Sequence, residues 1–303
     1  MSLPIIPFAE GEVLLDWLEL TQAFAAGHML PKAEIGDTFL YREPDTLLSR
    51  AAWIDGMGLA VKSATVFPGN PAKGKPMVNG GVCLYSDADG MLEALVDFHL
   101  VTKWKTAGDS LLGALRLARQ DSESVLIVGA GTVGASLCEA FAAGFPKAKQ
   151  TIWNRTTGKA RALAEEKGAD LAEDLETAVR AADIIVTATM STEPIIKGDW
   201  LRPGQHLNLI GAYRPDMREA DDGALLKSNV YVDSFDTTLG HIGELKTPLA
   251  EGVIQREDVL ADFYALDAFR RGGAEDITFF KNGGGAHLDL MTSRYILGKW
   301  QAA

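Results

Sequence analysis

The residues VLIVGAGTVGASLCEAFAAGFPKAKQTIWNR, from Val125 to Arg155, decide the fold of this chain. An apolar run, Val125–Val128, meets the glycine turn Gly129–Gly134, and an alanine-rich helical pattern then leads to a second apolar segment, 151–153. A strand, a tight glycine turn, a helix and a second strand within about 30 residues are the order of a dinucleotide-binding βαβ unit. The stretch therefore predicts a Rossmann-type domain, with an ordinary glycine-rich βα turn as the alternative.

Three glycines of the turn have separate physical roles. Gly129 permits the tight turn, Gly131 lets backbone N–H groups approach a pyrophosphate, and Gly134 lets the helix pack closely on the strand. The phosphates would then lie at the positive end of the helix dipole. Thr132 and Val133, which begin the helix, belong to the same predicted cofactor site.

The end of the second strand bears on the choice of cofactor. A site that prefers NAD usually has Asp or Glu here, which accepts hydrogen bonds from the ribose 2′-hydroxyl. This chain has Asn154, Arg155 and Thr156 instead. A neutral amide tolerates a 2′-phosphate, and a guanidinium can pair with it through two parallel hydrogen bonds. We therefore predict NADP(H) in preference to NAD(H), unless Arg155 is only a solvated surface charge.

Composition narrows the class of protein. The 303 residues suggest two domains, and a formal net charge of −12 argues against binding nucleic acid or an anionic membrane surface. An anionic substrate then needs a local cluster of Lys or Arg. Two cysteines, Cys83 and Cys138, make no disulfide framework, which favours a reducing cytoplasm. No apolar run reaches the ~18 residues of a membrane span, and the histidine and cysteine spacings predict no metal site.

The alternation of strands and helices continues beyond Arg155 and predicts a parallel, doubly wound α/β sheet. Residues 249–271 carry a helical pattern, and residues 286–300 a closing helix. The preceding part of the chain has a different pattern. It predicts a helix over 11–29, two strands within 47–67, a hairpin over 77–98 and a helix from about His99 to Arg119. A separate N-terminal domain should therefore supply the groups that hold the substrate over the nicotinamide.

Three cations of this N-terminal part have apolar neighbours. They are Arg50, Lys62 and Lys105. A charged side chain within an apolar strand is costly unless it is paired, and a substrate carboxylate would be a fitting partner. Side chains that extend to solvent, or internal salt bridges, are the alternatives.

Several segments, in their order and spacing, resemble the ornithine cyclodeaminase/μ-crystallin family over essentially the whole chain. They are Val61-Lys62 with Phe67–Pro71, Lys105-Thr106-Ala107, the late glycine turn, Thr187–Thr189, Gly211–Glu219 and Asp276–Lys281. The resemblance implies a Rossmann domain, 120–282, and an α+β substrate and dimerisation domain, 1–119, completed by 283–303. It also implies a homodimer that uses NAD(P) on small amino or imino acids.

The resemblance carries roles to individual residues. Lys62 matches the active-site lysine that contacts the substrate carboxylate, and Lys105 lies where the family commonly has arginine. The family's arginine on the first strand has no clear match, and Arg50 is a candidate substitute. Gly283 lies at the expected substrate site. Cofactor contacts are expected at Thr106, Thr189, Gly211, Ala212 and Asn282.

Tyr213 departs from the family pattern. Cyclodeaminases and alanine dehydrogenases have an aspartate here that handles the amine and its proton. A tyrosine, with an ordinary pKa near ~10, is a poor general base at neutral pH, although it can donate a hydrogen bond. Reduction of a preformed C=N bond needs mainly hydride delivery and a carboxylate anchor.

The sequence therefore predicts an NADPH-dependent reductase of a small imino acid, such as the cyclic ketimine pyrroline-2-carboxylate. Lys62 and Tyr213 are the predicted catalytic residues. An ornithine cyclodeaminase or an alanine-type dehydrogenase is the first alternative, and a non-catalytic carrier with bound NADP(H) is the second.

Overall fold

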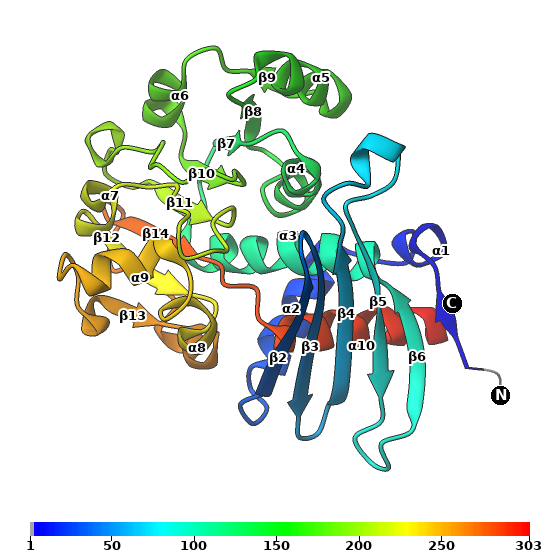
Figure 1. The fold of residues 1–303 in the computed structure, drawn as a ribbon. Helices are drawn as coiled ribbons and strands as arrows, with labels where there is room; N and C mark the ends of the chain where they lie inside the picture. Colours follow the sequence, from blue (N-terminus) through cyan, green and yellow to red (C-terminus); the bar gives the residue numbers. More distant parts are fainter. Residues whose placement is uncertain (1–2) are drawn as a thin grey trace. The chain divides into compact units, whose positions relative to one another are not determined.

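The computed structural model describes residues 3–303, which divide into two compact units (Figure 1). The first unit runs to Lys105 and is completed by Gly285–Ala303, so it is built from both ends of the chain. The second unit is Thr106–Gly284. No helix among the described residues is long and apolar enough to cross a membrane.

A six-stranded sheet forms the centre of the first unit, in the order β1-β6-β5-β4-β3-β2. The strands from β2 to β6 pair antiparallel with their neighbours, and β1 pairs parallel with β6. The bounds are Ile5–Ile6 (β1), Glu34–Arg42 (β2), Asp45–Ile54 (β3), Gly58–Val66 (β4), Val78–Tyr85 (β5) and Leu92–Asp97 (β6). The two strands expected within 47–67 and the hairpin expected over 77–98 are present.

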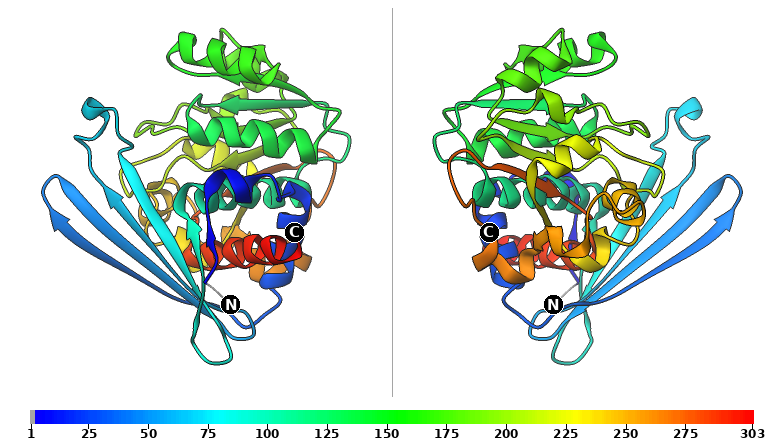
Figure 2. Two further views of the ribbon diagram at one scale, coloured as in Figure 1. Left: turned by 90° about the vertical axis from the view of Figure 1, so that its right-hand side faces the viewer. Right: turned by 90° about the vertical axis from the view of Figure 1, so that its left-hand side faces the viewer.

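Helices cover one face of this sheet. They are α1 (Phe8–Glu12), α2 (Trp17–Gly27), the first part of α3 (Phe98–Leu117) and α10 (Ala286–Ala302). A short, exposed 3-10 turn, η1 (Pro71–Lys73), lies between β4 and β5. Helix α10 packs on β3 and β4, and α2 packs on α10. In Figure 2 the red α10 lies along one face of the blue and cyan strands.

The single helix expected over 11–29 is two helices. Asp16 begins the second of them, because its carboxylate accepts hydrogen bonds from the backbone N–H groups of Leu18 and Glu19. A side chain that satisfies the first free N–H groups of a helix in this way fixes where the helix starts. The apolar spacing of this segment is compatible with one continuous helix and does not reveal the break.

The alternation of side chains gives the sheet two different faces. Ala52 and Ala60 point towards the helices and are buried, whereas Trp53 points away and is 49% exposed. Successive residues of a strand point to opposite faces, so the even-numbered positions of β3 and β4 share the covered face. The other face carries apolar side chains that no described element covers.

The second unit is an eight-stranded parallel sheet, in the order β13-β12-β14-β11-β10-β7-β8-β9. The strands are Ser124–Val128 (β7), Lys149–Trp153 (β8), Asp170–Leu171 (β9), Ile184–Thr187 (β10), His206–Leu209 (β11), Ser228–Val232 (β12), Val259–Ala261 (β13) and Ile277–Lys281 (β14). The helices are α4 (Thr132–Gly144), α5 (Thr157–Lys167), α6 (Leu175–Ala181), α7 (Asp222–Leu226), α8 (Phe235–Thr238) and α9 (Gly243–Ala250), with the 3-10 turns η2 (Gly198–Trp200), η3 (Arg256–Asp258) and η4 (Phe263–Ala268). The order reverses beside β7, as in doubly wound sheets, so the predicted fold class is confirmed.

The helical pattern predicted over 249–271 is present only in part, because η3 and η4 are short 3-10 turns and a strand lies between them. Residues up to Ala250 finish α9, and Gly252 then adopts a positive φ of 72° that ends the helical path. Val259 and Ala261 are buried on either side of the exposed Leu260, which is the period of an edge strand. Residues 259–261 form β13, which pairs with β12, because alternate side chains can pack there.

The boundary between the units lies within α3, not in the polar segment 120–124. The second half of α3 packs against the second unit's sheet. There the Ser110 hydroxyl donates to Asn208, and a side chain at Gly113 would meet the ring of Phe280 at 2.3 Å.

Candidate functional site

A row of charged side chains crosses the covered face of the first sheet. Arg50 of β3 lies directly opposite Lys62 of β4, and Asp37 of β2 lies directly opposite Arg50. Two like charges at directly opposed positions repel each other unless something of opposite sign lies near them. Asp37 provides part of the negative charge that offsets this repulsion, because Arg50 Nε lies 3.1 Å from each of its carboxylate oxygens.

Lys62 is the most deeply buried member of the row. Its Nζ donates to Asp289 Oδ1 at 2.9 Å and to Thr102 Oγ1 at 2.8 Å, and lies 4.7 Å from the centre of the Phe98 ring. The side chains of Lys62 and Asp289 are 8% and 2% exposed. A lysine ammonium has three donors. Two of them are used by Asp289 and Thr102, so one remains for an anion.

The electrostatics of the pair reflect this burial. Burial lowers the pKa of Lys62 from 10.5 to about 8, and the Asp289 charge opposes that shift. Burial alone would raise the pKa of Asp289, but the charges of Lys62, Lys105 and Arg50 hold it below its ordinary value. Both side chains are therefore charged at neutral pH.

The predicted cations of the first unit form one electrostatic cluster. Arg50 and Lys105 both act on the pKa of Lys62 and of Asp289, which places the three cations close together. Asp37 and Asp289 bring negative charge into the same cluster. In a chain with a net charge of −12, three cations gathered around a lysine with an open hydrogen-bond donor are suited to binding a carboxylate.

Two histidines complete the buried polar set. The rings of His28 and His287 meet edge to face, with centroids 5.3 Å apart. Burial first, and then the neighbouring His28, hold the pKa of His287 well below its ordinary value. His287 is therefore neutral at physiological pH and adds no charge to the cluster.

The glycine turn of the second unit has the shape of a phosphate cradle. Gly129 has a φ of 124°, and a Cβ at Gly134 would lie 2.0 Å from the Gly129 carbonyl oxygen. A Cβ at Gly131 would meet no atom within 4 Å, so the space above this residue, which precedes the first turn of α4, is open. The turn is closed where the strand and helix pack and open where a phosphate would approach, so these residues fit a dinucleotide.

Of the residues that follow β8, Asn154 contacts the glycine turn and Arg155 is exposed to solvent. Asn154 Oδ1 accepts a hydrogen bond from the Ala130 N–H at 3.2 Å, and its Nδ2 donates to the Thr156 carbonyl at 3.1 Å. Asn154 thus ties the end of β8 to the glycine turn. Arg155 is exposed and makes no ion pair with another described residue, so its guanidinium is available to a ligand.

One carboxylate joins the loops that follow β10 and β11. Glu219 Oε1 accepts hydrogen bonds from the Thr189 N–H and hydroxyl, both at 2.7 Å. Its Oε2 accepts from the N–H groups of Gly211 at 2.7 Å and Ala212 at 3.3 Å. A Cβ at Gly211 would lie 2.4 Å from Glu219 Oε1, so glycine is required for this contact. The predicted cofactor residues Thr189, Gly211 and Ala212 are therefore fixed by a single buried side chain.

A second buried carboxylate holds the first. Glu244 accepts the backbone N–H groups of Glu219 at 2.7 Å and Ala220 at 3.0 Å. Burial, followed by the repulsion of Glu219, raises the pKa of Glu244 to about 7. Lys281 is fully buried close to both carboxylates, and its Nζ donates to the Leu209 carbonyl at 2.9 Å. This network stabilises the carboxyl edge of the parallel sheet.

The residues after β14 lie at the same edge. Asn282 is buried, and its Nδ2 has no hydrogen-bond partner among the residues that the structure describes. A Cβ at Gly283 would meet the Thr238 hydroxyl at 2.5 Å, and the Gly284 N–H donates to Asp233 at 2.6 Å. An unpaired amide donor next to a position that only glycine can occupy is suited to binding the polar end of a cofactor or substrate.

Tyr213 follows Ala212 at this edge and is 52% exposed. The guanidinium of Arg214 lies 5.5 Å from the centre of its ring and is itself paired with Asp216. Thr106 is half-buried at the start of the second unit's part of α3. Among residues 3–303, no group of three or more His, Cys, Asp or Glu side chains could hold a metal ion.

The second unit, a parallel sheet with a phosphate cradle, and the first unit, with a buried lysine cluster, define a nicotinamide-dinucleotide-binding protein of two domains. Residues 52–303 match the ornithine cyclodeaminase/mu-crystallin family. The Delta(1)-pyrroline-2-carboxylate reductase of Paracoccus denitrificans is 50% identical over 300 residues, which cover 96% of this chain and 95% of that protein. The ketimine reductase mu-crystallin of Mus musculus is 31% identical over 247 residues, 80% of this chain and 77% of that protein.

Solved structures agree with this likeness. The Delta(1)-pyrroline-2-carboxylate reductase of Thermococcus litoralis, in complex with NADH and L-proline, has a TM-score of 0.89 at 25% identity, over 99% of this chain and 98% of that one. An archaeal alanine dehydrogenase dimer with bound NAD has a TM-score of 0.89 at 28% identity, over 100% of this chain and 97% of that one. The chain belongs to the ornithine cyclodeaminase/mu-crystallin family, as its motifs predict. Its reductase relatives also confirm the predicted enzyme class, an oxidoreductase.

The open space at Gly131 gives a test of the cradle. Gly131→Ala should fold as the parent does, because its backbone is extended and its Cβ would meet nothing. The added methyl group should nevertheless weaken nicotinamide cofactor binding by about tenfold or more, equivalent to about 1.4 kcal/mol. Fluorescence titration with NADPH measures the affinity, and thermal unfolding checks the fold. Gly158→Ala, an equally open position, is the control, and unchanged affinity in Gly131→Ala would contradict the cradle.

Proposed function

We propose that this chain reduces the C=N bond of a small imino acid of the pyrroline-2-carboxylate class with a nicotinamide cofactor. The observation that carries the proposal is the cluster around Lys62, a buried cation with one open hydrogen-bond donor and two further cations, Arg50 and Lys105, near it. It is suited to a single carboxylate. The 50% identity to a Delta(1)-pyrroline-2-carboxylate reductase supports this substrate class.

The residues of the first unit have a binding role in this reaction. Lys62 donates its remaining hydrogen bond to the substrate carboxylate, and Arg50 and Lys105 supply further positive charge. The side chain of Arg50 is 23% exposed, so it is only partly buried. A charge-assisted hydrogen bond of this kind fixes the carboxylate and, with it, the adjacent C=N carbon.

The second unit supplies the cofactor site. The Gly129–Gly134 turn would hold the pyrophosphate, and the loops fixed by Glu219 would hold the nicotinamide end together with Asn282. When bound in its reduced form, the cofactor supplies the hydride that adds to the C=N carbon. The imine nitrogen then keeps the electron pair of the former double bond and carries a proton.

Tyr213 favours reduction over the alternatives. Its phenol can donate a hydrogen bond, but it offers no carboxylate to accept a proton from a free amine. Cyclodeamination and alanine oxidation both begin from such an amine, whereas an imine is often protonated in solution. The exposed Tyr213 is therefore compatible with a proton supplied by the phenol or by water.

We also propose a preference for NADPH over NADH. Arg155 is exposed and without an ion pair among residues 3–303, next to an asparagine that is occupied in holding the turn. A guanidinium in this place can form a bidentate pair with a 2′-phosphate, and no acidic side chain at the end of β8 repels it.

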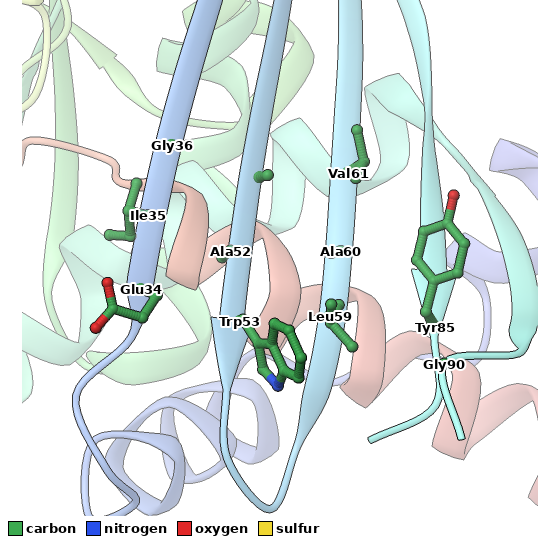
Figure 3. A pocket seen from close by; sticks show the side chains of 11 residues that line it. Glu34, Ile35, Gly36, Ala52, Trp53, Leu59, Ala60, Val61, Tyr85 and Gly90 are labelled. Carbon is green, nitrogen blue, oxygen red and sulfur yellow. The ribbon is translucent and has the colours of Figure 1, made fainter. Parts of the chain in front are cut away.

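A second copy of the chain is the proposed partner of the uncovered face of the first sheet. Trp53, Leu59 and Tyr85 lie side by side on this face, and Figure 3 shows them projecting from β3, β4 and β5 around a hollow. A contiguous apolar surface of this kind typically marks a protein interface. The dimer described for the archaeal alanine dehydrogenase supports a homodimer.

Steady-state assays test the reaction. The protein should oxidise NADPH in the presence of pyrroline-2-carboxylate or its six-membered homologue, and should act poorly on ornithine and alanine. Lys62→Ala should lower kcat/KM for the imino acid by about a hundredfold, since a buried charge pair is worth roughly 2–5 kcal/mol, and should leave NADPH affinity unchanged. Lys147→Ala, an exposed lysine of the second unit, is the control. Tight NADPH binding without turnover of either the five-membered or the six-membered cyclic imino acid would instead favour a non-catalytic carrier.

Reversal of the charge at Arg155 tests the cofactor preference. Arg155→Asp should raise the Kd of NADPH by about a hundredfold, since loss of a bidentate pair together with new repulsion costs roughly 3 kcal/mol, and should alter the Kd of NADH much less. Arg161→Asp makes the same charge change at an exposed position of α5. Equal effects of Arg155→Asp on both cofactors would mean that Arg155 does not contact the 2′-phosphate.

A charge on the uncovered face tests the homodimer. Trp53→Glu should convert the protein to a monomer, because an interface core excludes an unpaired carboxylate, while the half-exposed position tolerates the change in the fold. Light scattering after size-exclusion chromatography gives the mass. Leu260→Glu alters a similarly exposed apolar residue of β13 and should leave the dimer intact. A dimeric Trp53→Glu protein would exclude this face as the interface.

A further inference from the structure

We propose that Asp289 is a positioning residue for the reaction, which both aims the Lys62 ammonium and keeps it charged so that it can hold the substrate carboxylate. Nothing in the sequence pattern marks this role, because Asp289 lies in the apolar part of the closing helix, α10. The inference rests on the proposed function, since it concerns the same lysine.

The geometry limits what Asp289 does. Its Oδ1 accepts the Lys62 hydrogen bond at 2.9 Å, and its Oδ2 has no hydrogen-bond partner among the described residues. An ordinary structural carboxylate in a protein core uses both oxygens, usually on backbone N–H groups. Among the described residues, the Asp289 carboxylate accepts its hydrogen bond from Lys62. Its hydrogen bonding therefore serves the lysine and not the course of the backbone.

The direction of the remaining lysine donor follows from the other contacts. Asp289 takes one N–H of Nζ and Thr102 takes a second at 2.8 Å, while the ring of Phe98 lies beside the ammonium. With two donors fixed from α10 and α3, the third points in one direction only. Loss of the Asp289 contact would leave Nζ held at one point and free to rotate.

The charge of Lys62 also depends on Asp289. Burial, Lys105 of α3 and Arg50 of β3 all lower the pKa of Lys62, and Asp289 is the group that raises it. Asp37 of β2, which is paired with Arg50, and the histidines His28 of α2 and His287 of α10 are further titratable groups of this cluster. Without the Asp289 charge, a lysine whose pKa is already about 8 would become largely neutral at physiological pH.

Four variants separate the effect of Asp289 on the direction of the Lys62 ammonium from its effect on the charge of Lys62. Asp289→Asn removes the charge and keeps the shape, and Asp289→Glu keeps the charge and moves it. Thr102→Val removes the other hydrogen bond of Lys62. Asp37→Asn is the matched control, because it is the same substitution on the same face but next to Arg50.

Two measurements are made on each protein. The first is the pH titration of the Lys62 Cε resonance in lysine labelled with carbon-13, assigned by its absence in Lys62→Ala. The second is the pH dependence of kcat and KM for the imino acid at saturating NADPH. The first measurement needs no turnover, so it remains informative if the proposed substrate class is wrong.

In the wild type, Lys62 should titrate near pH 8, and KM should rise as the pH rises through that value. Asp289→Asn should lower the pKa of Lys62 and move the rise in KM to lower pH, with about a tenfold higher KM at neutral pH if the pKa falls by about two units. Asp289→Glu and Thr102→Val should keep a pKa close to that of the wild type and raise KM without moving its pH dependence. Asp37→Asn should leave the Lys62 titration in place.

The proposal is overturned if Asp289→Asn leaves both the Lys62 titration and the pH dependence of KM unchanged. A purely structural Asp289 would lower the unfolding temperature of both Asp289 variants and change neither readout. If Asp289→Asn does not fold, Asp289→Glu decides: a raised KM with a retained pKa supports positioning, and an unchanged KM overturns it. Absence of turnover in the wild type, with the expected shift of the Lys62 titration, would refute the proposed function alone.

Discussion

The charged cluster of the first unit is built around the buried ion pair between Lys62 and Asp289. The pair joins the middle strand β4 to the closing helix α10, across 227 positions of the sequence. Removing two charges from water costs several kcal/mol per ion, and their attraction offsets this only where the geometry is good and further hydrogen bonds are made. Thr102 supplies one such bond. A site that keeps an incompletely satisfied pair at this cost is more consistent with binding an anion than with stability.

In the second unit, buried carboxylates hold several loops at the carboxyl edge of the parallel sheet. Glu219 accepts four hydrogen bonds from the loops after β10 and β11, and Glu244 fixes the backbone of Glu219 in turn. Preorganised groups of this kind need no rearrangement when a ligand binds. The same arrangement explains why Gly211 has no side chain, since a Cβ there would meet the Thr189 backbone at 2.1 Å and the Glu219 carboxylate at 2.4 Å.

Sequence patterns predicted the parts of this structure that depend on local chemistry. The glycine turn, the strand–helix alternation and the three cations could be read because each has a characteristic residue type at a characteristic spacing. Asp289, Glu219 and Glu244 could not be assigned roles, because their partners are brought to them by the fold. The break at Asp16 and the edge strand β13 were missed for the same reason, since capping and strand pairing outweigh the apolar period there. Only a structure could show that Arg50 and Lys62 are direct neighbours.

The central claim is that the Lys62 cluster recognises a carboxylate. Competitive inhibition by L-proline and by L-prolinamide, measured against the imino acid at saturating NADPH, tests it most directly, because the two ligands differ in the group that Lys62 would hold. The account predicts that L-proline binds more tightly by about tenfold or more, as expected for loss of one charge-assisted hydrogen bond of roughly 1.5–3 kcal/mol. Equal inhibition constants for the two ligands would contradict it.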